Sequence, residues 1–524
     1  GMRPPVLLAA LLAAAGLQGG RAEGQPVLDD GWDMCATCPG LKNPCLNATF
    51  ARLPFCNASL TIDQRVADAV GRLTQQEKVW ALSTGTKALP SLGLPAYNWW
   101  SEGTHGVSHV KFDAETPYAS NFAMPITTAC SFNRTLWRAT GAQIGREARA
   151  FMNVGHAYST FWAPVVNLAS DPRWGRNLET PGEDPYLTGQ YSANWVAGFQ
   201  TSPEDPSHLQ AAANCKHFLG HQMEDWNGTD RTKFNAVVTK QDLHDSYMPP
   251  FQDCVEMGRV AGLMCSYNAL NGVPSCANEW LQETIARGTW HFDGYITSDC
   301  GAIESVYEGQ NYTKTPEETV KAVFAAGTDL NCGYDFTTKH SQAALDKGLI
   351  TEADLDARLA NIFRTRFRLG HFDQTPMASV GVDQICTEPA IQLAMEGAIE
   401  GTVLLKNNGT LPWPKGKLAT VIGPNVNVTR KIAPYYGPRI PCFAKYWTMV
   451  DAVERHARSV SFRLGVPDVL SNDSSLLQVA VDAAAVAEQV VLAVGQDGSI
   501  ESEGKDRNSI ALSAGQLRLI EAVA

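Results

Sequence analysis

The sequence lacks the features that would point to a membrane, a nucleic acid or a metal. The one apolar run at the N-terminus is too short for a membrane-spanning helix, and no other stretch reaches the length of about 18 apolar residues that such a helix needs. The formal net charge is −12, which gives no indication of nucleic acid or of an acidic membrane surface as a partner. After Cys35-x-x-Cys38, no second such pair and no histidine follow at zinc spacing. A phosphate-cradling loop is also missing, so we expect neither a metal nor an organic cofactor.

The N-terminus indicates secretion. Arg3 precedes an apolar run over 6–17 and then small residues, which is the pattern of a signal peptide over 1–22. Eight Asn-x-Ser/Thr sequons follow, at Asn47, Asn57, Asn133, Asn227, Asn311, Asn408, Asn427 and Asn472. We therefore expect a secreted, extracellular protein that carries N-linked glycans at several of these sites.

The cysteines agree with an oxidising compartment. The chain has 13 of them, and four lie in a Cys- and Pro-rich arm over 23–75. We expect Cys35 and Cys38 to form disulfides with Cys45 and Cys56. The odd total leaves at least one thiol free.

From 76 to 370, apolar strand-like runs alternate with helical patterns. The candidate strands are 161–169, 212–220, 234–239, 262–268, 294–299 and 327–332. Helical segments include 316–326 and 351–370, the latter with Thr351 as N-cap and Gly370 as its stop. This alternation predicts an α/β fold with a parallel sheet, most economically a (β/α)8-type TIM barrel.

Two disulfides are predicted within this barrel. Cys300 and Cys332 each end a candidate strand, and Cys265 and Cys276 flank one loop. Both pairs would lie near the carboxyl ends of the strands.

A second α/β unit, 396–524, follows a linker over 371–395. Its candidate strands are 402–407, 418–424 and 490–496, with a helix-rich stretch at 476–489. This order predicts a doubly wound α/β sandwich domain. The last residues still show a helical pattern, so we expect the domain to be incomplete at its C-terminal end.

Polar residues gather where the candidate barrel strands end. Asn167, Lys216–His217, Tyr267 and Asp299 each follow an apolar run. An aspartate in such a place is often only a turn former, but the carboxyl ends of barrel strands also form the active face. Charged groups and tryptophans at 99–102 and 171–184 would suit a neutral polyhydroxylated ligand, because hydroxyls bind charged groups and Trp covers an apolar ring face.

A second acidic cluster lies at 498–507, just past the strand at 490–496. It contains Glu501 and Glu503, which on spacing alone are more typical of a solvated surface loop. Sugar hydrolysis, however, needs two carboxyl groups in different protonation states. Asp299 and a glutamate of this loop could supply that pair.

These stretches resemble glycoside hydrolase family 3 and, within it, the secreted fungal and plant β-xylosidases. The matching motifs occur in family order: "YNWWSEGTHGV" (97–107), "FWAPVVNLASDPRWGRNLETPGEDPYL" (161–187), "CKHFLGH" (215–221), "LMCSYNALNGVP" (263–274), "GYITSDCGAI" (294–303), "LLKNNGTLPW" (404–413) and "SIESEGKDR" (499–507). They cover nearly everything after the predicted signal peptide.

The resemblance implies roles for the candidate residues. Asp299 matches the family's nucleophile, and Tyr267 matches a residue beside it. Glu503 is the implied acid/base, with Glu501 as the alternative, because this loop varies across the family. Lys216 would help to keep the nucleophile ionised.

The resemblance also implies how a sugar would bind. Lys216 and His217 match a sugar-binding pair, and Arg176 matches a ligand of a sugar hydroxyl. Glu102 stands where β-glucosidases commonly have aspartate. The longer side chain would fill the space of the hydroxymethyl group that xylose lacks.

The implied activity is that of a retaining exo-β-xylosidase that releases xylose from the non-reducing ends of β-1,4-xylo-oligosaccharides. Three alternatives stay open within the family: a β-glucosidase, an α-L-arabinofuranosidase, or an enzyme with both xylosidase and arabinofuranosidase activity. The alternative outside enzymes is a carbohydrate-binding protein without turnover, since family members continue beyond Ala524.

Overall fold

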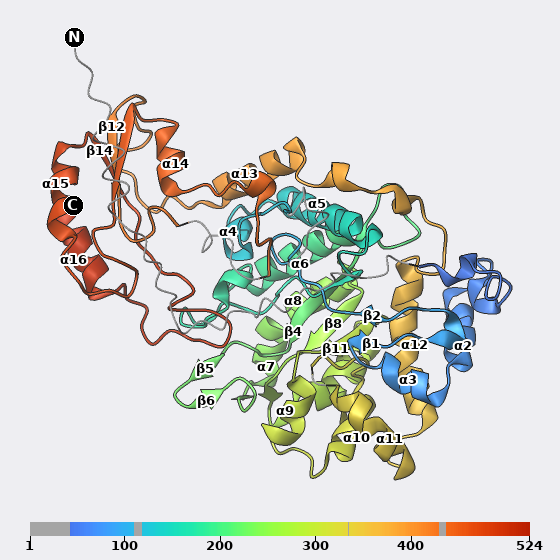
Figure 1. Cartoon of the computed structure of the whole chain (residues 1–524). Helices are drawn as coiled ribbons and strands as arrows, with labels where there is room; N and C mark the ends of the chain where they lie inside the picture. Colours follow the sequence, from blue (N-terminus) through green and yellow to red (C-terminus); the bar gives the residue numbers. More distant parts are fainter. Residues whose placement is uncertain (1–41, 109–117, 334, 429–435) are drawn as a thin grey trace. The chain divides into compact units, whose positions relative to one another are not determined.

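The computed structural model describes residues 42–108, 118–333, 335–428 and 436–524 (Figure 1). The predicted signal peptide and the first part of the N-terminal arm, with Cys35 and Cys38, lie outside these residues. Over the described ranges, no helix has the length and apolar character needed to cross a bilayer.

A four-stranded parallel sheet lies at the centre of the first α/β part, in the order β11–β8–β4–β3. The strands are β3 (Thr160–Phe161), β4 (Ala212–Phe218), β8 (Gly262–Cys265) and β11 (Tyr295–Ser298). All of their residues are buried, which is typical of parallel strands covered on both faces. The strands predicted at 212–220, 262–268 and 294–299 are therefore confirmed, whereas the run 161–169 contributes only a short strand.

Backbone contacts extend this sheet beyond β11. Thr297 bridges Leu330 in parallel, and Asn331 in turn bridges Ser83. The predicted strand at 327–332 is therefore present as these bridges and not as a full strand.

The sheet continues beyond β3 in the same way. Ser101 donates its N–H to Thr160 O (3.1 Å) and accepts from Trp162 N–H (2.9 Å). The series closes through β1 (Gly85–Thr86) and β2 (Tyr97–Asn98), which pair antiparallel.

The α/β class is confirmed, but a regular eightfold barrel is not. The closing pair of β1 and β2 is antiparallel, and the run predicted at 234–239 supplies only β7 (Asn235–Ala236). That short strand belongs to a separate small sheet with β9 (Ala269–Leu270) and β10 (Val273–Pro274).

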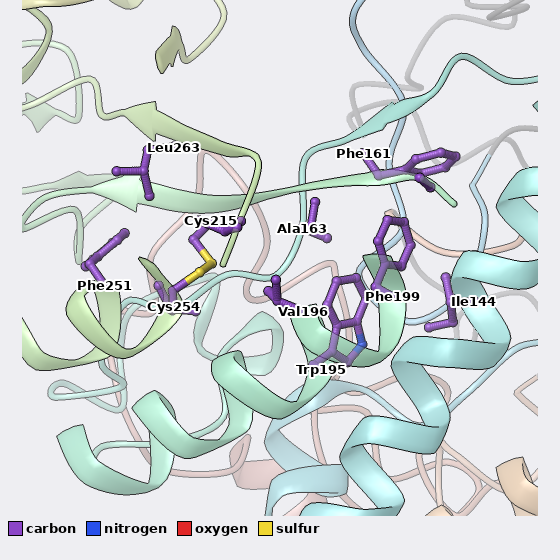
Figure 2. Packing of buried hydrophobic residues seen from close by; sticks show 14 of the residues in the cluster. Ile144, Phe161, Ala163, Trp195, Val196, Phe199, Cys215, Phe251, Cys254 and Leu263 are labelled. Carbon is purple, nitrogen blue, oxygen red and sulfur yellow. A yellow bond between two sulfur atoms is a disulfide. The ribbon is translucent and has the colours of Figure 1, made fainter. Parts of the chain in front are cut away.

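Helices α5 (Arg134–Asn153), α6 (Pro185–Gln200) and α8 (Pro249–Glu256) pack against one another beside β4. Figure 2 shows their apolar side chains with those of the sheet. The rings of Trp195 and Phe199 stack at 4.8 Å. A disulfide between Cys215 and Cys254 joins β4 to α8. This core fixes the strand from which Lys216 and His217 emerge.

Two predicted helices on the other side of the core are confirmed. Helix α10 spans Pro316–Ala326. Helix α12 spans Glu352–Arg368 after Thr351, whose hydroxyl accepts from Asp354 N–H, and Gly370 just beyond it has φ +74°. The remaining elements of this part are α2 (Ile62–Arg72), α3 (Gln75–Ala81), α4 (Pro125–Ala129), β5 (Asp225–Trp226), β6 (Thr229–Asp230), α7 (Lys240–Asp242), a π-helix (Trp280–Thr289), α9 (Ala302–Glu308) and α11 (Phe336–Asp346).

The disulfides confirm part of the prediction. Cys265 pairs with Cys276, and Cys300 pairs with Cys332, as expected. The pairing proposed for the arm is wrong, because Cys45 bonds to Cys56, which leaves neither for Cys35 or Cys38. The structure adds Cys386–Cys442, and Cys130 is a free thiol, consistent with the odd count.

The second α/β part follows helix α13 (Glu388–Gly401). It contains a parallel sheet in the order β13–β12–β14, formed by β13 (Ser459–Arg463), β12 (Leu418–Ile422) and β14 (Gln489–Leu492). Its helices are α14 (Met449–Glu454), α15 (Leu477–Val486) and α16 (Ala514–Val523). The strands predicted at 418–424 and 490–496 and the helix at 476–489 are confirmed.

The strand predicted at 402–407 is wrong. No strand within the described ranges pairs with this segment, and Leu405 is 92% exposed. The apolar sequence fits a buried strand, but a strand needs a neighbour to satisfy its backbone groups.

Candidate active site

Asp299 directly follows strand β11 and is buried, with 8% of its surface exposed. Its Oδ1 accepts the backbone N–H of Cys300 at 2.7 Å. Its Oδ2 lies 3.5 Å from His217 Nε2, and no protein group within the described ranges hydrogen-bonds to it. A carboxylate that is held by one oxygen and bare at the other is suited to attack.

Strand β4 brings Lys216 and His217 to the same place. Lys216 Nζ contacts both carboxylate oxygens of Glu102, at 2.9 and 3.1 Å. Trp100 Nε1 donates to Glu102 Oε1 at 3.1 Å. The amide of Asn167 clamps the backbone of His217, with contacts of 2.7 and 2.9 Å. The polar strand ends of the sequence therefore do converge.

Glu503 comes from the second α/β part and meets two guanidinium groups. Its Oε1 lies 2.8 Å from Arg231 Nη1 and 3.4 Å from Arg176 Nη1. Its Oε2 accepts a hydrogen bond from the hydroxyl of Tyr436. Arg176 is itself fixed by Glu179, at 2.7 and 3.0 Å.

Tyr267 connects the two carboxyl groups. Its hydroxyl donates to the carbonyl of Cys300, the residue after Asp299, at 2.9 Å. The guanidinium of Arg231 lies over its ring, 4.2 Å from the centroid. The seven predicted site residues therefore lie in one region, where the guanidinium groups of Arg176 and Arg231 both contact Glu503.

Glu501, the alternative acid, faces elsewhere. Its Oε2 lies 3.5 Å from Arg507. The pKa of Glu501 is raised by burial, against the opposing charge of Arg507. Geometry therefore favours Glu503 as the partner of Asp299.

The pKa values of the two central carboxyl groups are shifted in opposite directions. Burial raises the pKa of Asp299, and the positive charges of Arg231 and Arg176 oppose that rise. Burial also acts to raise the pKa of Glu503, but Arg176 and Arg231 outweigh it and lower that pKa to about 2. Burial and the charge of Arg176 hold the pKa of His217 well below its ordinary value, so this ring is neutral.

Lys216 is not the positive charge that lowers the pKa of Asp299 most, although the sequence predicted it as the charge partner. Lys216 does lower the pKa of Asp299, as expected, but Arg231 and Arg176 act more strongly. The ammonium group of Lys216 is instead the ion-pair partner of Glu102.

Sequence reasoning missed four residues of this site: Glu179, Glu224, Arg231 and Tyr436. Glu179 lay inside the acidic stretch at 171–184, so that stretch was a usable signal. Arg231 follows the hairpin of β5 and β6, and Tyr436 lies in a loop of the second part. Neither has a local pattern that distinguishes it from a surface residue.

Glu102 provides a test of these electrostatics. Burial raises its pKa to about 7, against the opposing charge of Lys216. A carboxyl group whose pKa is higher in the folded state than in the unfolded state favours folding at low pH. We expect the stability of the protein, relative to Glu102→Gln, to fall as the pH rises from 4.5 to about 7. Urea unfolding at pH 4.5 and 8 measures this, and a stability difference that stays constant would contradict it.

Comparisons with known proteins identify the family of the chain. The model of the glycosyl hydrolase family 3 N-terminal domain matches residues 75–365, and that of the family 3 C-terminal domain matches residues 402–524. The chain belongs to glycosyl hydrolase family 3.

The curated relatives are mainly named as xylosidases. The chain is 44% identical to Beta-D-xylosidase 3 of Arabidopsis thaliana, over 91% of this chain and 62% of that protein. It is 43% identical to Beta-xylosidase/alpha-L-arabinofuranosidase 2 of Medicago sativa subsp. varia, over 99% of this chain and 66% of that protein. The chain therefore spans less than two thirds of the length of these relatives.

Solved structures give the same picture. A GH3 exo-β-xylosidase in complex with a xylobiose aziridine activity-based probe matches with a TM-score of 0.87 and 33% identity, over 93% of this chain and 63% of that one. A β-glucosidase from Listeria innocua, at 20% identity and a TM-score of 0.76, shares the fold over 88% of this chain and 67% of that one.

Proposed function

We propose that this chain forms the active site of a retaining exo-β-xylosidase, which releases xylose from the non-reducing ends of β-1,4-xylo-oligosaccharides. The observation that carries the proposal is the convergence on Arg231. Its guanidinium contacts Glu503 at 2.8 Å and is the strongest positive influence on Asp299. Two carboxyl groups from different parts of the chain thereby lie under the influence of one guanidinium group.

In this mechanism, ionised Asp299 attacks the anomeric carbon with its bare Oδ2, and the bond to the leaving oxygen breaks. Glu503 gives its proton to that oxygen, and the xylosyl group is then bonded to Asp299. Glu503 next takes a proton from water, which attacks the same carbon and releases Asp299 and xylose. Retention requires a carboxyl separation of about 5–5.5 Å.

The protonation of the substrate-free site must change for these roles. Glu503 is ionised there and needs a proton to act as an acid. Arg176 is the more distant of its two cationic partners, at 3.4 Å, and is also the proposed ligand of a sugar hydroxyl. We infer that a bound sugar engages Arg176, which weakens its hold on Glu503 and raises the pKa of that group. A bound sugar also excludes water from both carboxyl groups.

The pair of Glu102 and Lys216 supports a pentose substrate. Glu102 is buried, and its position is fixed by Lys216 and Trp100. Two rigid polar groups would bind sugar hydroxyls and leave little space for a hydroxymethyl group. Lys216 Nζ also lies 4.4 Å from the ring centroid of Tyr436, which narrows this side of the site.

A second candidate is an enzyme with both xylosidase and α-L-arabinofuranosidase activity. Two Medicago relatives, at 43% and 42% identity, carry both activities in their names. The alternative outside enzymes is a carbohydrate-binding protein that binds the sugar without hydrolysing it.

A panel of aryl glycosides tests the proposal. We expect kcat/KM to be highest for the β-xyloside and at least about tenfold lower for the β-glucoside, since one hydroxymethyl group in a fitted pocket is worth ~1–3 kcal/mol. Comparable values for the β-xyloside and the α-L-arabinofuranoside would favour the dual enzyme. A preference for the glucoside, or binding without hydrolysis, would overturn the proposal.

We also propose the finer organisation of the chain. The closed series of backbone contacts around β3, β4, β8 and β11 supports a modified (β/α) barrel over 76–370. The linker would be 371–395 and the sandwich domain 396–524. Within the described residues, five disulfides and exposed asparagines at seven of the eight sequons support a secreted glycoprotein.

A further inference from the structure

Glu503 lies on a tight turn that is itself tied down. Ser502 and Lys505 form an antiparallel bridge, and Gly504 between them has φ +76°. Gly504 and Lys505 are exposed, so the turn gains little support from burial. Two carboxylates hold it: that of Glu224 binds the turn itself, and that of Asp506, which follows the turn in the chain, binds the first part of the chain.

Asp506 reaches from the second α/β part into the first. Its Oδ1 accepts the backbone N–H of Gly175 at 2.8 Å. Its Oδ2 accepts the backbone N–H groups of Glu224 at 2.8 Å and Asp225 at 3.0 Å. Three backbone donors around one buried carboxylate make a strong, directional anchor, because charged acceptors form the stronger hydrogen bonds.

Glu224 completes the anchor from the opposite side. It is 1% exposed, and its Oε2 accepts the N–H of Gly504 at 3.0 Å and a hydrogen bond from Arg231 at 2.7 Å. Its Oε1 accepts from Trp174 Nε1 at 3.0 Å and lies 2.9 Å from His221 Nε2. One carboxylate therefore fixes both the backbone next to Glu503 and the guanidinium that contacts the Glu503 side chain.

The backbone of Gly175 lies directly against the turn. A Cβ on Gly175 would lie 2.1 Å from Lys505 O and 2.3 Å from Ser502 O. A further backbone hydrogen bond runs from Arg507 N–H to Arg173 O at 2.8 Å. The turn is therefore held by close backbone approach as well as by charge.

We infer that Asp506 and Glu224 are positioning residues for Glu503: they hold the turn 502–505 so that its glutamate faces Asp299. Glu224 contacts the turn and Arg231, whereas Asp506 directly follows the turn in the chain and binds the backbone of the first part. Both act on the reaction through the place of the turn. This inference rests on the proposed function, because it assigns the anchor to the acid/base of that reaction.

Asp506→Asn is the direct test. The amide can present only one oxygen to three N–H donors, so we expect the turn to lose its fixed place. A misplaced acid costs most where the leaving group needs protonation. We expect kcat/KM for xylobiose to fall about 10²-fold and that for a 2,4-dinitrophenyl xyloside to fall less than about threefold.

Asp451→Asn is the matched control, since Asp451 caps α14 in the same part of the chain and lies outside the site. It should leave both substrates unchanged. Gly175→Ala disturbs the same turn without a change of charge, and it should reproduce the selective loss on xylobiose. Equal losses on both substrates for Asp506→Asn and Gly175→Ala would overturn the inference.

Hydrogen exchange separates this inference from the proposed function. We expect Asp506→Asn to raise amide exchange in 502–507 at least about tenfold, while the core strand β4 exchanges as in the wild type. Unchanged exchange in 502–507 would overturn the anchor even if the enzyme is active. An inactive wild-type protein with the expected exchange would instead overturn the proposed function.

Discussion

Asp299→Ala is expected to abolish turnover, with a loss of about 10⁴-fold or more in kcat, because no other group can form the bond to the anomeric carbon. The neighbours of Asp299 make the loss specific. Cys300 N–H and His217 orient this carboxylate, but neither carries a nucleophilic oxygen. The measurement is release of the aryl group from an aryl β-xyloside.

Asp451→Ala serves as the control, since it is the same substitution at an aspartate that belongs to the capping box of α14, in the second part. Added azide should not restore a retaining reaction to Asp299→Ala. Substantial activity of Asp299→Ala on the aryl xyloside would show that another residue is the nucleophile.

Glu503→Gln should produce a loss that depends on the leaving group. We expect kcat/KM to fall about 10³-fold for xylobiose but about tenfold or less for a 2,4-dinitrophenyl xyloside, which departs without a proton. The charge of Glu503 also raises the pKa of Asp299. The acidic limb of the pH profile should therefore move to lower pH in this variant.

Glu501→Gln is the matched comparison for Glu503→Gln. Glu501 contacts Arg507 and lies away from the two arginines of the site, so this variant should lose little on either substrate. An equal loss on both substrates for Glu503→Gln, together with a selective loss for Glu501→Gln, would assign the acid/base role to Glu501.

Much of the site could be predicted because strand ends carry local signals. Asp299 follows an apolar strand and Lys216–His217 lie near the carboxyl end of another, and such strands place these ends at one edge of a parallel sheet. The family motifs then assigned Glu503, whose loop has no feature that would separate it from a solvated surface by itself. The predicted residues do meet in the structure, although their catalytic roles remain proposals.

The rest depends on contacts between distant segments. Glu503 contacts Arg231 and Tyr436, which lie 67 or more residues away in the sequence. Asp506 lies beside Glu503 in the sequence, but its partner Gly175 is distant, so no local pattern encodes this contact. The wrong strand at 402–407 has a similar cause. Its residues fit a strand, but strand formation depends on a partner elsewhere in the chain.

Labelling of the nucleophile tests the central claim most directly. A 2-deoxy-2-fluoro-xyloside with an activated leaving group should react once and leave a stable glycosyl ester, because the fluorine slows both steps and the activated leaving group restores the rate of the first step only. Peptide mass spectrometry should then find the sugar on Asp299. The alternative is that Glu503 is the nucleophile, which the raised pKa of Asp299 and the low pKa of Glu503 make a specific rival. A label on Glu503 would contradict the assignment of both carboxyl groups.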